Sequence, residues 1–143
     1  MRNIGRLNAE IKFLMAYYGQ QQIWWPDNYS WIRIEKFKMP CNINSVSSEV
    51  LVIVPENYGY GEPYKDCFIK AGLRVWHPTQ YHWVEIPHYF DKENAVNKYY
   101  DKNWRYMCIH QDGWNPAKDN IMTYLNQVYT FLCNPFRDWN RRT

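Results

Sequence analysis

Two helical patterns near the ends of the sequence, with strand patterns between them, most strongly limit the fold of this chain. Residues 3–18 place apolar side chains at a helical spacing, and Gly19 follows as a natural C-terminal stop. Apolar residues between 121 and 132 repeat that spacing, and Asn134-Pro135 closes the second helix. The middle of the chain must therefore be arranged so that both helices can bury their apolar faces.

Consecutive strand patterns lie between the two helices. Residues 31–38 alternate apolar and polar side chains, residues 49–54 form a strand that is apolar after Glu49, and turn-forming residues separate the two runs. This pair predicts an antiparallel hairpin. Residues 68–76 predict a third strand that Ala71-Gly72 interrupts. The order predicts an α+β fold, an antiparallel meander with helices packed on one face.

The chain of 143 residues is expected to form one domain, since that length supports a single sizeable core. Residues 79–104 carry many aromatic side chains without a clean period, and we interpret them as an elaborated loop. Aromatic residues make up 19% of the chain. Most of them are expected in the core, and a few on an exposed binding face, where Trp and Tyr are favoured anchors.

Charge and cysteine content narrow the cellular setting. The net charge of +3 is too balanced to indicate nucleic acid, and no Gly-rich phosphate loop is present. The four cysteines form no CxxC pair, and the sequence shows no signal peptide and no membrane-spanning apolar run. These features predict a cytoplasmic protein with reduced thiols that binds neither nucleic acid nor membrane.

The stretch from 105 to 116 contains the cysteine with the most distinctive surroundings. An apolar run ends at Cys108, a polar loop with a glycine follows, and Asn115-Pro116 predicts the N-cap and first position of the second helix. A cysteine on a loop before a helix suits an exposed reactive thiol. Cys67 and Cys133 are expected to be buried, inert cysteines, while Cys41 lies in a turn without neighbouring catalytic residue types.

Several short motifs occur in an order that matches one family. They are residues 6–12 (RLNAEIK), residues 50–58 (VLVIVPENY) with Pro63, His77-Pro78, Cys108-Ile109 with Trp114-Asn115-Pro116, and residues 132–135 (LCNP). Together they resemble the ubiquitin-conjugating enzymes, whose domain is called the UBC fold. The resemblance covers nearly the whole chain, here residues 1–143 as a single UBC-like domain.

The chain also departs from the family pattern. Thr79 stands where the family's His-Pro-Asn motif has its asparagine, and residues 79–104 look like an insertion before Cys108. The chain ends soon after Pro135, without the family's last two helices. In this it resembles bacterial relatives from antiphage defence operons, including cyclic-oligonucleotide signalling systems.

The resemblance implies a transferase that carries an acyl group as a thioester on Cys108. The implied partners are a protein with a conjugatable C-terminus (a ubiquitin-like protein or a nucleotidyltransferase of a defence operon) and an activating enzyme that would use the ATP. The chain itself is expected to need no cofactor. The first helix, with Arg6, and the loop from 55 to 63, with Tyr58, are the expected partner surfaces.

The sequence defines the residues that would assist Cys108 in catalysis less well than it defines Cys108 itself. His110 and His77 are candidate general bases because imidazole titrates near neutral pH, although each alone fits a surface or loop-supporting role. Asp119 is a candidate for orienting an incoming lysine, or simply favours the helix dipole, and Trp114 is expected to pack the loop. Zinc ligation by Cys108 with histidines matches no zinc motif, so no metal is predicted. An inactive UBC-fold binding module and a zinc- or RNA-binding adaptor remain as alternatives.

Overall fold

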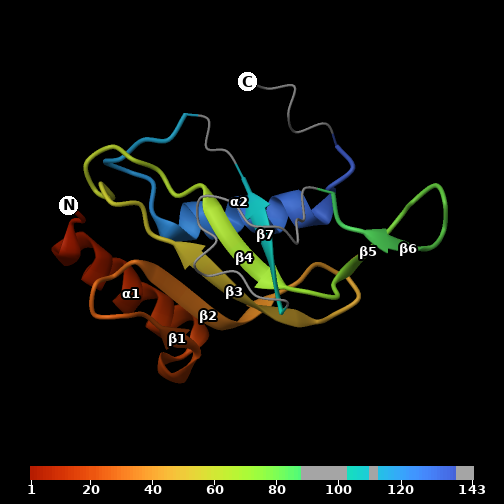
Figure 1. Ribbon diagram of the computed structural model, residues 1–143, viewed down its shortest axis with the longest axis horizontal. Coiled ribbons are helices and arrows are strands. Elements are labelled where there is room, and N and C mark those ends of the chain that lie inside the picture. Colours follow the sequence, from red (N-terminus) through yellow and green to blue (C-terminus); the bar gives the residue numbers. More distant parts are fainter. Residues whose placement is uncertain (88–102, 110–112, 138–143) are drawn as a thin grey trace.

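A computed structural model describes residues 1–87, 103–109 and 113–137 of the chain. Its regular elements, in chain order, are α1 (Ile4–Tyr18), the 3-10 turn η1 (Gln20–Gln22), β1 (Ile23–Trp24), β2 (Trp31–Lys38), β3 (Ser47–Ile53), β4 (Asp66–Lys70), β5 (Arg74–Trp76), β6 (Trp83–Glu85), β7 (Trp104–Cys108) and α2 (Ile121–Cys133). The protein is therefore α+β, with a helix at each end of an antiparallel sheet (Figure 1).

Within the described residues, five strands form the main sheet in the order β1-β2-β3-β4-β7, and every neighbouring pair is antiparallel. The hairpin expected from residues 31–38 and 49–54 is confirmed: Ile34 lies opposite Val50 in the β2–β3 pair. Val50 in turn lies opposite Ile69 of β4. Apolar residues thus align across the three central strands.

The third strand expected over 68–76 is two strands in two different sheets. β4 ends at Lys70, and β5 pairs with β6 in a separate two-stranded sheet that projects beyond the main body (Figure 1). Gly72 separates them, with a positive φ of 86° that favours glycine. The apolar run ending at Cys108 is also a strand, β7, and it occupies the place beside β4.

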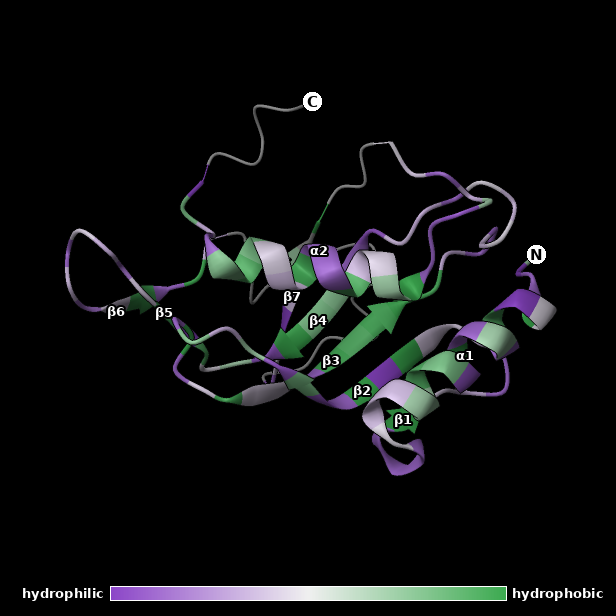
Figure 2. Ribbon diagram, turned by 180° about the vertical axis from the view of Figure 1, so that it is seen from behind, coloured by the Kyte–Doolittle hydropathy of each residue, from purple (hydrophilic) through white to green (hydrophobic). Residues whose placement is uncertain are grey.

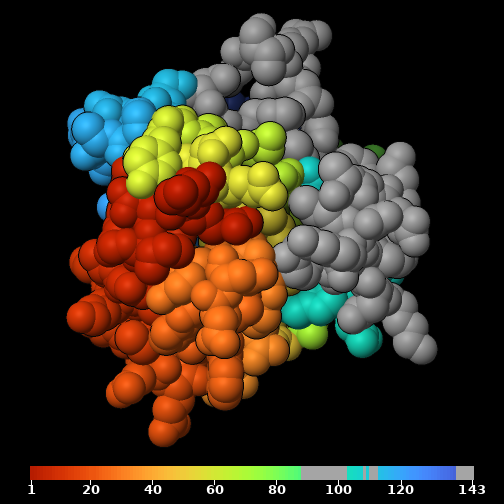
Figure 3. Space-filling view, turned by 60° about the vertical axis from the view of Figure 1, so that its left-hand side comes forward, coloured from red at the N-terminus to blue at the C-terminus, as the bar shows by residue number. Residues whose placement is uncertain are grey.

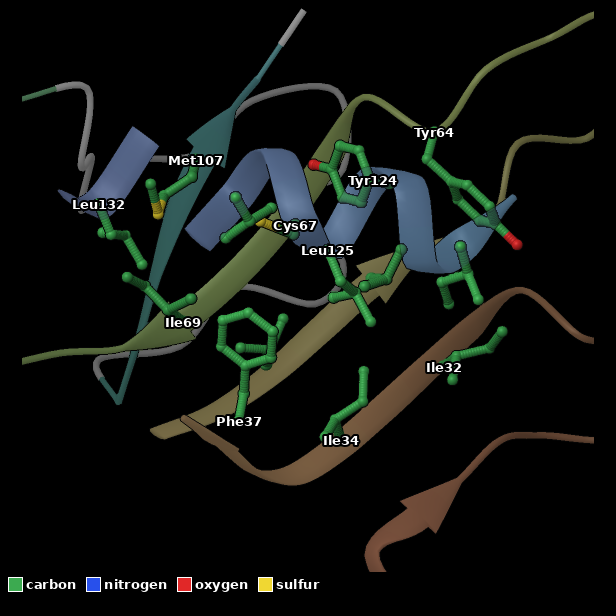
Figure 4. Packing of buried hydrophobic residues seen from close by; sticks show 14 of the residues in the cluster. Ile32, Ile34, Phe37, Tyr64, Cys67, Ile69, Met107, Tyr124, Leu125 and Leu132 are labelled. Atoms are coloured by element: carbon green, nitrogen blue, oxygen red, sulfur yellow. The ribbon is translucent and has the colours of Figure 1, made fainter. Parts of the chain in front are cut away.

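Helix α2 covers one face of the main sheet (Figure 2). Its buried face includes Tyr124, Leu125, Val128 and Leu132, and inward-facing strand residues meet it from below (Figure 4). Cys67 of β4 is fully buried in this layer, as expected for an inert core cysteine.

Helix α1 lies over the β1 end of the sheet, on the same face as α2, and its buried side joins the same core (Figure 2). Leu7, Ile11 and Leu14 are buried, whereas Phe13 is 57% exposed. The helix ends at Gly19, whose N–H donates to the Met15 carbonyl, so the predicted stop is confirmed. Neither helix of the described residues is long and apolar enough to cross a membrane.

The predicted start of the second helix at Asn115-Pro116 is wrong by several residues. The N-cap is Asn120, whose side chain accepts hydrogen bonds from the Met122 and Thr123 amides, while the Thr123 hydroxyl accepts from the Asn120 amide. This reciprocal pair satisfies the unpaired amides of the first turn. Asn115 instead begins a turn, and its carbonyl accepts a hydrogen bond from the Asp119 amide.

Cys133 also differs from expectation, because it is exposed rather than buried. It follows Leu132, which is fully buried. One residue along a helix turns the side chain by about 100°, and this carries Cys133 off the apolar face at the last position of α2.

Replacing the cap tests the observed start of α2. Asn120→Ala removes the acceptor of two first-turn amides and should lower the free energy of unfolding by about 1 kcal/mol. Urea denaturation followed by tryptophan fluorescence measures the change. Asn126→Ala, at an exposed position inside α2, is the matched control and should change stability by less than about 0.5 kcal/mol. Equal losses in the two variants would contradict the assigned cap.

Candidate functional site

Cys108 is the last residue of β7 and lies opposite Asp66, the first residue of β4. The next amide, of Ile109, donates to the Lys65 carbonyl at 3.0 Å. Cys108 thus ends a strand, whereas the sequence predicted a loop position. The structure places its backbone at the end of the sheet where β4 begins. The Cys108 side chain and the whole of His110 lie outside the described residues.

A buried carboxylate organises the region around the start of α2. Glu10 of α1 is only 8% exposed. Its Oε2 accepts hydrogen bonds from the Tyr58 hydroxyl at 2.6 Å and from Arg6 Nε at 3.1 Å. Its Oε1 accepts from the Ile121 amide at 2.8 Å and from the Tyr64 hydroxyl at 3.3 Å. One side chain therefore joins α1, the loop after β3 and the first turn of α2.

Arg6 extends this network to the segment before α2. Its guanidinium lies 5.0 Å from the centre of the Tyr58 ring and donates to the carbonyls of Pro116 and Asp119. The Asp119 carboxylate accepts from the Asn115 amide at 2.7 Å and so holds the turn closed. Three predicted binding residues, Arg6, Tyr58 and Asp119, are thus brought together.

Trp114 belongs to the same group through aromatic packing. Its ring meets the Tyr64 ring edge-on at 6.1 Å, and Tyr64 packs on Tyr58 with ring centres 4.3 Å apart. The ring centre of Tyr124 of α2 lies 5.8 Å from that of Tyr64. Trp114 therefore fixes its loop against the core, as the sequence predicted for it.

The two tyrosines that bind Glu10 are held in their neutral form. Burial raises the pKa of the Tyr64 phenol well above its usual value, and the nearby Glu10 carboxylate raises it further. Burial and the hydrogen bond to Glu10 also raise the pKa of Tyr58. A neutral phenol keeps its proton and can donate it to the carboxylate, so the arrangement is stable across the neutral range.

Sequence reasoning missed Glu10 and Tyr64. A signal for Glu10 was present, since it lies three residues after Leu7 and four before Leu14, on the apolar face of α1. A carboxylate in that position is rarely buried without partners. No comparable local pattern identifies Tyr64.

His77 lies apart from this group. It follows β5, its ring centre is 4.5 Å from that of Phe136, and its Nδ1 accepts from the amides of Thr79 and Gln80. Phe136 stands just beyond the last residue of α2, while Glu10 binds the first. A helix of 13 residues is about 20 Å long, so the two groups lie at opposite ends of α2.

A groove runs between α1 and the segment that leads into α2. Its volume is about 480 Å³. Arg6, Glu10 and Phe13 line it from α1, and the residues from Pro116 to Lys118 line it from the segment before α2. In the space-filling view the N-terminal helix, the loop after β3 and the blue segment before α2 lie side by side (Figure 3).

No protein-family model matches the chain, and no curated protein or solved structure matches it. Within the part of the chain that the structure describes, no three His, Cys, Asp or Glu side chains gather closely enough to hold a metal ion.

Glu10→Gln tests the carboxylate network. An amide nitrogen in place of one oxygen faces hydrogen-bond donors and leaves them unpaired, so the free energy of unfolding should fall by about 2–3 kcal/mol. Urea denaturation measures the loss. Glu35→Gln, at an exposed position of β2, is the control and should change stability by under about 0.5 kcal/mol. A loss no larger than that in the Glu10 variant would refute the network's role.

Alkaline pH should weaken the same network. The folded-state pKa values of Tyr58 and Tyr64 are raised, so their contribution is complete below the unfolded tyrosine pKa of about 10 and is lost as pH rises above it. The melting temperature should fall progressively from pH 9 to pH 11, measured by circular dichroism. The fall should be smaller in Tyr64→Phe and unchanged in Tyr60→Phe, whose side chain is exposed. Identical slopes in all three proteins would contradict this account.

Proposed function

We propose that this protein is a ubiquitin-conjugating-like transferase that accepts a protein C-terminus as a thioester on Cys108. The observation that carries the proposal is the position of Cys108 in the chain's architecture. It ends the last strand of the antiparallel sheet, and the chain then leads through the Trp114 segment into the helix that covers that sheet. The order of helix, sheet, cysteine and covering helix is the one that the resemblance to the UBC fold implies.

The proposed acyl transfer requires a sulfur nucleophile and a group that accepts a proton from the incoming amine. The Cys108 thiolate attacks the carbonyl carbon of an activated C-terminus, and the activating group leaves with the bonding electrons. The thioester that results remains reactive toward amines. An amine of the target then attacks the same carbonyl and loses a proton, and the Cys108 thiolate is released. His110, two residues after Cys108 in sequence, is our candidate for accepting that proton.

The buried Glu10 network supports this proposal by giving the segment from Gly113 to Asn120 a fixed position. Arg6, Trp114 and Asp119 all hold that segment by side-chain contacts. Positioning of reacting groups contributes strongly to group transfer. The segment is accordingly the part of the chain that we assign to orienting the acyl group and the incoming amine.

The proposed partners follow from the same assignment. The acyl donor is a protein with a conjugatable C-terminus, either a ubiquitin-like protein or a nucleotidyltransferase, delivered by an activating enzyme. Arg6 of α1 and Tyr58 of the loop after β3 are in contact, but Tyr58 is fully buried, so the exposed residues of that loop, and not Tyr58, would form the partner surface beside α1. We place this activity in bacterial antiphage defence, in the cytoplasm.

A second candidate function is a catalytically inactive binding module with the same fold. His77 favours it, because its ring packs on Phe136 and its Nδ1 is occupied by the turn amides of Thr79 and Gln80. The direction of β4 carries the chain away from Asp66, the partner of Cys108, before it reaches β5 and His77. A module of this kind would bind the same proteins without forming a covalent adduct.

A synthetic peptide with a C-terminal thioester separates the two candidates without requiring the natural activating enzyme. The purified chain should take up the peptide by thiol exchange, and the adduct should disappear on treatment with dithiothreitol. Cys108→Ala should form at least about tenfold less adduct, since the other cysteines lack the same surroundings. Intact-protein mass spectrometry measures the occupancy.

Cys41→Ser and Cys133→Ser serve as matched controls, because both cysteines are exposed and neither is part of the proposed site. Both variants should retain the adduct. An adduct that persists in Cys108→Ala, or the failure of the unaltered protein to form one, would reject the transferase proposal and leave the binding module.

A further inference from the structure

Two cysteines outside the proposed site meet at the C-terminal end of α2. Cys133 is the last residue of that helix, and Cys41 lies in the turn after β2. Asn42 connects them: its Nδ2 donates to the carbonyl of Leu132 at 3.0 Å and to the carbonyl of Cys133 at 3.2 Å. Residues that are more than ninety positions apart in sequence are therefore held together by hydrogen bonds at this point.

Both thiols are accessible, and both are free in the structure. They also interact with each other. Partial burial raises the pKa of the Cys133 thiol, and the neighbouring Cys41 thiolate raises it further. The second effect requires proximity, because the interaction between charges near a protein surface weakens quickly with distance.

The backbone around the pair is anchored by hydrogen bonds. The Cα atoms of Asn42 and Cys133 are linked through the Asn42 side chain and its hydrogen bond to the Cys133 carbonyl. This link limits their separation to about 9 Å. The carbonyl of Asn42 also accepts from the Trp76 amide at 2.8 Å, which holds the turn in place. A disulfide needs Cα atoms about 4.4–6.8 Å apart. Cys41 lies in a turn and Cys133 at a helix end, so neither cysteine is part of a strand.

The other two cysteines lie elsewhere in the fold. Cys67 is fully buried under α2, and the backbone of Cys108 lies opposite Asp66 at the start of β4. In reducing compartments, disulfides that do form are usually transient or redox-sensing. Two exposed cysteines held together by a fixed turn match that description.

We propose that Cys41 and Cys133 form a reversible intramolecular disulfide with a small-molecule disulfide, such as oxidised glutathione, as the oxidant. One protein thiolate attacks the oxidant and releases one equivalent of glutathione thiolate, which leaves a mixed disulfide. The second protein thiolate then attacks the protein sulfur of that mixed disulfide and releases the second equivalent. Two protein thiols are oxidised, and one glutathione disulfide is reduced to two thiols.

The cross-link would tie the turn after β2 to the end of α2. It closes a loop of about ninety residues, and cross-links across long loops restrict the unfolded chain most strongly. The oxidised protein should therefore melt about 10 °C higher than the reduced protein. Because the link lies outside the proposed acyl-transfer site, it is independent of the proposed function.

The test uses the full chain in the Cys108→Ser background, so that acyl-acceptor chemistry does not interfere. The reduced protein is equilibrated with mixtures of reduced and oxidised glutathione, alkylated, and analysed by intact mass and by non-reducing peptide mapping. The expected product has lost the mass of two hydrogen atoms and contains a peptide pair joined through Cys41 and Cys133. The product should melt higher, and dithiothreitol should restore the original melting temperature.

Two further variants make the result decisive. Cys41→Ser and Cys133→Ser, each added to that background, should abolish the internal link and the rise in melting temperature. The proposal is overturned if glutathione remains attached without closure of the link, if the link includes Cys67, or if only dimers between chains form. It is also overturned if no thiol reacts under conditions that oxidise a model dithiol.

Discussion

The buried carboxylate of Glu10 is the interaction on which the arrangement of the helices depends. Burying a charged group is unfavourable unless hydrogen-bond donors compensate for the lost water. Here donors come from Arg6, Tyr58, Tyr64 and Ile121, in three segments that are far apart in sequence. The carboxylate that holds α1 and the loop after β3 together therefore also fixes the position of the first turn of α2.

Patterns within single segments predicted the parts of the fold that local forces decide. The helix ending at Gly19 and the β2–β3 hairpin follow from side-chain periodicity and turn residues. The start of α2 shows the limit of such reasoning. Asn115 and Asn120 are both suitable N-caps, and the choice depends on Thr123, which completes the reciprocal cap at Asn120.

Contacts between distant segments decided the strand pairing and the burial of Glu10, which the local sequence patterns did not predict. Nothing in the residues from 104 to 108 indicates that β7 should pair with β4 while β5 turns away to a separate hairpin. The burial of Glu10 likewise depends on two tyrosines about fifty residues further along the chain. The sequence therefore identified Arg6, Tyr58 and Trp114 as candidates, but it could not show that a carboxylate gathers them.

Helix α2 is held at both ends by side chains from other segments. Glu10 accepts the amide of its first residue, Ile121, and Asn42 donates to the carbonyl of its last residue, Cys133. Between these ends the apolar face of the helix packs on the sheet. A shift of α2 along its axis would break one of the two contacts, so the helix has one well-defined position. The segment from Gly113 to Asn120 leads directly into α2, so its position is fixed together with that of the helix. A partner that docks there meets a preorganised surface.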